Sequence, residues 1–285
     1  MDSRSSNALS RELGDALRRA RYRSTARFNA FAAEMGWSPG RLSKVERGTR
    51  GASEVDIARY VGHLHADQET YKHIMKLAQE QNTGHLVRSH EPAMPDDLRA
   101  LLIHEQTAEV IWSYEIIAIP GLLQTADYAR GLMRTPQGEY CVAQRMKRQK
   151  IFDKPQPPQG RFFIHEAALM RVSGGPQVMY EQMLQLLFRG GVRLVPFAVA
   201  LPGSLDVPFT FMTFAEHAPV SYSNIGTAGV FSDSPDTTFG FYQCCEDLDR
   251  VALSEGESRS VFADWAGRYD RLREEQRESG GDAVA

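Results

Sequence analysis

Hydrophobic residues recur at helical spacing through the first eighty residues of the chain. The first such stripe consists of Leu13, Ala16, Leu17 and Ala20. Four further helices are predicted over 26–35, 38–47, 54–64 and 67–81. The pattern therefore predicts an all-α N-terminal domain of five helices that occupies residues 1–81.

The second and third predicted helices are separated by a short turn. Gly36 stands where a helix can end in a left-handed conformation. Ser38 can cap the next helix, and Pro39 fits its first turn because the missing N–H has no intrahelical partner there. Two short helices joined in this way are typical of a helix-turn-helix.

Small and basic residues cluster at the start of the third predicted helix. Short side chains allow such a helix to enter the DNA major groove, which is about 12 Å wide. Basic residues at the helix end and in the following loop can bind phosphates. The predicted DNA contacts are Ser38, Gly40, Arg41, Ser43, Lys44, Arg47, Thr49 and Arg50. The alternative is a helix-turn-helix that contacts only protein.

Residues 82–97 contain two prolines, a glycine and no hydrophobic period, which predicts a linker. Beyond it the pattern alternates between helical and extended. Helices are predicted over 98–112, 124–134, 142–152, 177–188, 241–253 and 258–273. Strands are predicted over 113–119, 161–164, 192–197, 209–214, 220–222 and 229–232. We expect an α+β domain with a small mixed sheet over 98–275 and a disordered tail over 276–285.

The string IPGLLQTADYAR, residues 119–130, carries no evident chemistry. Pro120 would end a strand, Gly121 would allow a turn, and Thr125 could cap a helix. One interpretation is a strand-to-helix corner that stabilises the domain. The other is a ligand or partner surface that uses Gln124 and Tyr128.

Composition changes this picture little, but charge distribution adds to it. The chain of 285 residues is 42% hydrophobic and 24% charged, as expected of a globular protein, and its N-terminus lacks a signal-peptide core. We therefore expect a cytoplasmic protein with no membrane association. Residues 1–50 carry eleven basic and five acidic residues, although the whole chain has a net charge of −3. A basic N-terminal module on an acidic body favours binding to an anionic partner.

The sequence contains no diagnostic catalytic or metal-binding motif. His165 and Glu166 invite an acid–base interpretation, but neighbouring residues on a strand point to opposite faces. His63, His65 and His73 have no carboxylate or cysteine at a diagnostic metal-binding spacing. We expect no catalytic residue, no metal site and no cofactor.

The string SPGRLSKVERG, residues 38–48, resembles the recognition helix of Xre/Cro-type regulators. The resemblance covers roughly residues 8–80 and implies binding to a double-stranded DNA operator. Phe28 departs from the family, which usually places a DNA-contacting glutamine at that position.

The strings YEIIAIPGLLQTADYAR, RMKRQ, RFFIHEAAL and VRLVPF resemble those of actinobacterial regulators that join an Xre helix-turn-helix to a C-terminal domain. His165 departs from the aspartate common in that family. The resemblance implies a transcriptional regulator whose C-terminal domain senses a small-molecule effector or binds a protein. The alternative is an antitoxin-like protein that sequesters a small partner encoded nearby and autoregulates its operon.

We also expect a homodimer. Helix-turn-helix proteins commonly place two recognition helices one DNA turn apart, about 34–36 Å, and two copies of the chain would supply them.

Overall fold

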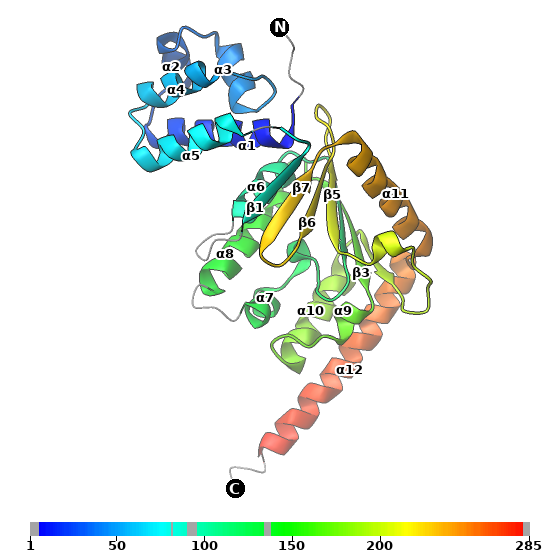
Figure 1. Ribbon diagram of the computed structural model, residues 1–285. Helices are drawn as coiled ribbons and strands as arrows, with labels where there is room; N and C mark the ends of the chain where they lie inside the picture. Colours follow the sequence, from blue (N-terminus) through cyan, green and yellow to red (C-terminus); the bar gives the residue numbers. More distant parts are fainter. Residues whose placement is uncertain (1–5, 81, 90–95, 134–137, 282–285) are drawn as a thin grey trace. The chain divides into compact units, whose positions relative to one another are not determined.

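The computed structural model describes residues 6–80, 82–89, 96–133 and 138–281 (Figure 1). Its α-helices are α1 (Ala8–Arg23), α2 (Phe28–Glu34), α3 (Pro39–Glu46), α4 (Glu54–His63), α5 (Gln68–Gln79), α6 (Asp96–Glu105), α7 (Ala126–Leu132), α8 (Gly138–Gln149), α9 (Ala167–Met170), α10 (Pro176–Phe188), α11 (Pro235–Val251) and α12 (Glu255–Gly281). Short 3-10 helices are η1 (Gly121–Leu123), η2 (Lys150–Asp153) and η3 (Gly203–Leu205). The strands are β1 (His85–Ser89), β2 (Val110–Glu115), β3 (Gln159–His165), β4 (Val192–Val195), β5 (Phe209–Thr213), β6 (Val220–Asn224) and β7 (Ala228–Ser232).

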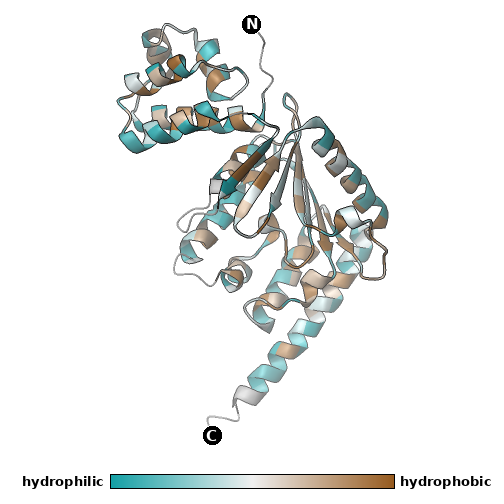
Figure 2. Ribbon diagram, in the orientation of Figure 1, coloured by the Kyte–Doolittle hydropathy of each residue, from teal (hydrophilic) through white to brown (hydrophobic). Residues whose placement is uncertain are grey.

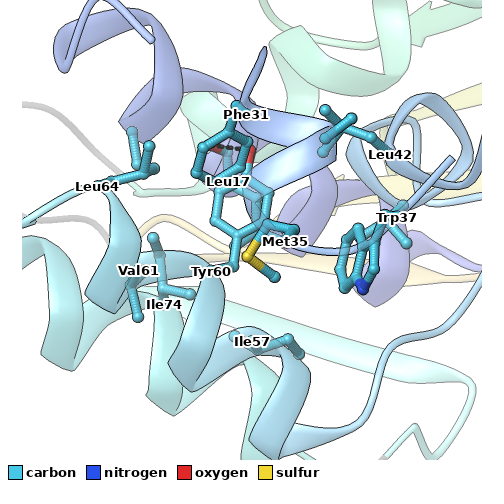
Figure 3. Packing of buried hydrophobic residues seen from close by; sticks show 13 residues of the cluster. Leu17, Phe31, Met35, Trp37, Leu42, Ile57, Tyr60, Val61, Leu64 and Ile74 are labelled. Carbon is cyan, nitrogen blue, oxygen red and sulfur yellow. Dashed lines mark hydrogen bonds between the residues drawn. The ribbon is translucent and has the colours of Figure 1, made fainter. Parts of the chain in front are cut away.

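The five N-terminal helices enclose one hydrophobic core, which confirms the predicted all-α domain. Each helix contributes at least one fully buried side chain, as Figure 3 shows for Leu17, Phe31, Leu42, Tyr60 and Ile74. The Phe31 and Tyr60 rings meet edge to face at 4.7 Å, a favourable geometry for aromatic pairs. Burial of these side chains stabilises helices that are too short to persist alone.

The strands form a seven-stranded mixed sheet in the order β1-β7-β6-β5-β2-β3-β4. Strands β2, β3 and β4 are mutually parallel, and helices fill the connections between them, as parallel pairing requires. Strand β7 pairs antiparallel with both β1 and β6. The predicted α+β class is confirmed, with a sheet larger than expected. Figure 2 shows strongly hydrophobic stretches along several strands, including β7.

Contacts divide the chain into two compact units. Unit 1 comprises residues 1–90, 96–107 and 213–238, and unit 2 comprises residues 91–95, 108–212 and 239–285. Unit 1 therefore combines the five N-terminal helices with α6, β1, β6 and β7. The sequence pattern instead predicts α6, β6 and β7 within the C-terminal domain over 98–275.

Unit 2 has its own hydrophobic core between its strands and α11. The Trp112 and Phe163 rings stack at 5.8 Å, and Leu248 of α11 is fully buried against this cluster. Cys244 and Cys245 are free and buried in the same core. Burial raises the pKa of both thiols and keeps them protonated.

Several sequence-based boundaries were wrong; for example, the helix expected over 241–253 begins at Pro235. Within the expected linker, residues 85–89 form β1, because Leu86 buries its side chain while the backbone pairs with β7. The helix expected over 98–112 ends at Glu105, and residues 110–112 join β2, since Ile111 is buried in parallel pairing with β3. Residues 276–281 of the expected disordered tail continue α12. The predictions for residues 81, 90–95, 134–137 and 282–285 lie outside the described residues.

Within the part of the chain that the structure describes, no helix combines the length and apolar character needed to cross a membrane.

Candidate nucleic-acid interface and the 119–125 loop

The turn before α3 forms as its residue types predict. Gly36 adopts φ of +67° after the last turn of α2, a conformation that glycine tolerates. The Ser38 hydroxyl accepts a hydrogen bond of 3.1 Å from the Arg41 backbone N–H, and Pro39 occupies the first helical position. These features fix the start of α3.

One face of α3 and its following loop is open to solvent in unit 1. Ser38, Gly40, Lys44, Arg47 and Arg50 are exposed among the predicted DNA contacts. A side chain added at Gly40 would meet nothing within 4 Å. The remaining three predicted contacts, Arg41, Ser43 and Thr49, are partly buried. The predicted residues therefore share one accessible region that is small at its start and basic at its end.

Arg41 is held by interactions within the protein. Its guanidinium pairs with Asp56 at 2.7 Å and lies 4.3 Å from the centre of the Trp37 ring. Lys44 is exposed and has no ion pair among the described residues. A base contact by Arg41 would compete with its pairing to Asp56, whereas Lys44 is available without such competition.

Glu46, near the end of α3, joins three helices of the core. Its carboxylate receives two hydrogen bonds from Arg21 of α1, at 2.6 and 2.8 Å. The Tyr60 hydroxyl of α4 donates to the same carboxylate at 2.5 Å. Arg21, Glu46 and Tyr60 are all buried, and the Glu46 carboxylate raises the pKa of Arg21. Glu46 thus fixes the orientation of α3.

Glycines let α1 pass close to the end of α3. A Cβ at Gly48 would lie 2.4 Å from the Ser10 carbonyl oxygen, and one at Gly14 would lie 2.7 Å from the Gly48 nitrogen. The Ser10 hydroxyl also donates to the Gly48 carbonyl at 2.9 Å. Packing of α1 against the end of α3 therefore requires glycine at positions 14 and 48.

Phe28 begins α2, at the position where the resembled family has a polar DNA contact. It is partly buried, and the Arg21 guanidinium carbon lies 5.1 Å from its ring centre. Phe28 therefore packs within the helical domain.

In unit 2, glutamine side chains hold the backbone of the 119–125 loop. Gln149 of α8 donates to the Gly121 and Gln124 carbonyls at 3.2 and 2.8 Å. Gln182 and Gln185 of α10 donate to the Leu123 carbonyl at 2.8 and 2.9 Å. Because these amides satisfy carbonyls that no strand or helix pairs, the loop can remain irregular and still pack inside the domain.

The two motif residues proposed for ligand or partner binding point inward. Gln124 is 3% exposed, and it donates to the Ile119 carbonyl at 2.7 Å and accepts from Arg145 at 2.5 Å. Tyr128 is fully buried, and its hydroxyl accepts from the Ile119 N–H at 3.1 Å. These contacts favour the strand-to-helix corner, while a binding role for either residue stays a prediction.

Leu122 and Leu123 bury their side chains, and Thr125 caps α7 by accepting from the Tyr128 N–H at 3.1 Å, as the sequence predicts.

Glu115 lies at the end of β2. Desolvation raises the pKa of its carboxyl to about 7, although Arg145 and Arg148 oppose the shift.

Beside this loop, unit 2 has a groove of about 360 Å³ formed by η1, α8, η2 and α10. Its walls include Leu122, Met146, Phe152 and Arg189. In unit 1 a second groove of about 710 Å³ lies between α5 and β1 and includes Tyr71 and Val87. Both volumes fall within the usual range for ligand sites, roughly 300–1,000 Å³.

His165 and Glu166 both contact Phe197. The His165 Nδ1 accepts from the Ala167 N–H at 3.2 Å, and its ring meets Phe197 edge to face at 4.8 Å. Glu166 accepts from the Phe197 N–H at 3.0 Å. Burial lowers the pKa of His165. Both side chains support the turn after β3.

Sequence reasoning missed the residues that hold these elements in place. Gln149, Gln182 and Gln185 look like ordinary helical glutamines, and no periodic signal distinguishes a glutamine that clamps a distant loop. Tyr60 was placed only within a helix, although its position on the hydrophobic stripe could have indicated burial.

Two family models match the chain. A model described as a helix-turn-helix domain matches residues 12–73, which contain α2, α3 and the open face. A model described as a domain of unknown function, DUF5753, matches residues 98–264. The chain therefore has a DNA-binding helix-turn-helix domain at its N-terminus. Searches of curated proteins and of solved structures return no significant match.

Proposed function

The chain belongs to the family defined by the domain of unknown function DUF5753, and we propose that it is a sequence-specific transcriptional regulator whose C-terminal domain receives a signal. We place its helix-turn-helix in the Xre type and expect an actinobacterial source. The single observation that carries the proposal is the accessible, basic face of α3 within the matched helix-turn-helix domain.

On an operator, one group of residues would contact base edges and another would bind phosphates. Lys44, and Arg41 after release from Asp56, would contact base edges in the major groove. Arg47 and Arg50, which follow α3 and are exposed, would bind phosphates. Ser38, Gly40 and Ser43 would allow close approach of the helix, and Thr49 would support the phosphate-binding turn through its bond to the Lys44 carbonyl.

The C-terminal domain would act without catalysis, cofactor or metal, in the cytoplasm. Its groove beside the 119–125 loop has the size expected for a small effector. An effector there would contact η1, which is part of the loop, and also α8 and α10, whose glutamines hold the loop carbonyls. A homodimer would present two copies of α3 to two operator half-sites.

An antitoxin-like role is the second candidate, and the groove between α5 and β1 favours it. Strand β1 lies at one end of the sheet, and Val87 and Tyr71 in this groove are 59% and 43% exposed. A terminal strand of a sheet beside apolar side chains is suited to an extended segment of a small partner protein.

Native mass spectrometry of the protein purified from its source cells separates the two candidates. An added mass of small-molecule size supports the effector role, and an added mass of several kilodaltons supports the partner role. Replacing Met146 with Trp should fill the unit 2 groove and remove a bound effector, whereas the exposed Met170→Trp should not. A chain that carries neither mass contradicts both roles for the C-terminal domain.

A further inference from the structure

The groove beside the 119–125 loop has one apolar wall. Leu122 of η1, Met146 of α8 and Phe152 of η2 contribute to it. The Arg189 guanidinium carbon stacks 4.3 Å from the Phe152 ring centre, which places a cation against the apolar wall. Such a wall is suited to a ligand with an aliphatic or aromatic arm.

The rest of the groove carries charges of both signs. Lys150 and Asp153 of η2 are exposed, and Arg189 is partly buried after α10. None of these three forms an ion pair among the residues that the structure describes. Opposite charges that do not pair with each other in one small groove can each pair with a ligand group.

Two side-chain amide oxygens add hydrogen-bond acceptors to the groove. Gln149 and Gln185 use their Nε2 groups to hold the loop carbonyls. Their Oε1 atoms accept no hydrogen bond among the described residues, and both side chains line the groove. An ammonium group needs acceptors of this kind, and a neutral ligand would form no charge-assisted bond with Asp153.

We propose that this groove binds a free dipeptide with apolar side chains, in its zwitterionic form. Lys150 and Arg189 hold the carboxylate, Asp153 and the glutamine Oε1 atoms hold the ammonium, and Leu122, Met146 and Phe152 contact the side chains. A volume of about 360 Å³ accommodates a dipeptide. The assignment rests on the proposed role of the C-terminal domain as a signal receiver.

Three probes differ only at their termini: Leu-Leu, N-acetyl-Leu-Leu and Leu-Leu amide. Titration calorimetry on the full chain should show binding of Leu-Leu and about tenfold or weaker binding of each blocked form, because each loses a charge-assisted contact. Equal binding of a blocked form and Leu-Leu overturns the zwitterion assignment. Failure of Leu-Leu to bind at millimolar concentration overturns the site.

Two variants test which groove residue binds each terminus of the dipeptide. The Asp153→Asn variant should bind N-acetyl-Leu-Leu as tightly as it binds Leu-Leu. In the Arg189→Gln variant, the loss of affinity between Leu-Leu and Leu-Leu amide should be smaller than in the wild type. Both residues lack ion pairs, so the fold should persist, which far-UV circular dichroism checks. Lys147→Gln, at an exposed position of α8 outside the groove lining, is the control and should retain the wild-type pattern. Unchanged discrimination in both groove variants overturns the assignment.

Operator binding by the same preparations separates this proposal from the broader function. If the wild-type chain binds its operator but does not bind Leu-Leu, the dipeptide proposal is overturned and the regulator proposal is not. Loss of sequence-specific DNA binding by the wild-type chain overturns the regulator itself.

Discussion

Side-chain amides stabilise the 119–125 loop where regular secondary structure is lacking. Gln124 satisfies the Ile119 carbonyl, and its own oxygen is the acceptor for Arg145. The sequence could predict that Leu122 and Leu123 are buried, because leucines at a strand-to-helix corner face the core. It could not predict the Gln124 bonds, since a polar residue in a loop is usually solvated.

Alanine at position 124 should therefore destabilise the protein. Gln124→Ala leaves the Ile119 carbonyl and Arg145 without these partners, which should cost about 1–3 kcal/mol. Leu123→Ala should cost about 2–5 kcal/mol through loss of a buried side chain. Urea unfolding checks both values. A Gln124→Ala midpoint equal to the wild type would show that the loop does not depend on these bonds.

Arg11 has an unusual environment in unit 1. It is 3% exposed, stacks 4.3 Å from the Phe214 ring centre, and neither terminal nitrogen has a hydrogen-bond partner among the described residues. Desolvation lowers the pKa of Arg11 to about 10, partly offset by Asp233. A buried cation with so few partners costs stability.

The same substitution should have opposite effects at two arginines of unit 1. Arg11→Met keeps the apolar stem and removes the poorly compensated charge, so the free energy of unfolding should rise by about 1–4 kcal/mol. Arg88→Met removes the pairs with Glu12 and Glu80 and should lower stability. Thermal melts of the two variants provide the comparison. Destabilisation by both would show that Arg11 has partners after all.

At the level of elements, the position of α3 depends on Glu46. Sequence reasoning predicted the bounds of α3 well, since Ser38, Pro39 and Gly48 are local signals. The link from Glu46 to Arg21 and Tyr60 joins residues far apart in the chain, and no local pattern encodes it. Strand β1 was missed for the same reason, because its partner β7 lies more than a hundred residues later.

Glu46→Gln tests this link. The change removes the charge that compensates the buried Arg21 and should destabilise the protein by about 3–5 kcal/mol. Glu34→Gln at an exposed position of α2 is the matched control and should change stability little. Chemical denaturation of both variants gives the two values. Similar midpoints for Glu46→Gln and the wild type would mean that packing alone positions α3.

For the whole molecule, we predict a homodimer. One recognition helix contacts only a few base pairs, and two helices about 34–36 Å apart raise affinity on a palindromic operator. Multi-angle light scattering of the free chain should give the mass of two chains, and the operator complex should contain two chains per duplex. A single chain in both states would contradict the prediction.

The central claim is that the open face of α3 reads DNA sequence. Fluorescence anisotropy at fixed salt, on an operator duplex and a scrambled duplex of equal length, tests it most directly. Lys44→Ala should weaken operator binding about tenfold or more with little effect on the scrambled duplex, because each base contact contributes roughly 1–3 kcal/mol of discrimination. Arg47→Ala should weaken both duplexes alike and reduce the salt slope by about one. An unchanged ratio of operator to scrambled affinity in Lys44→Ala would contradict the claim.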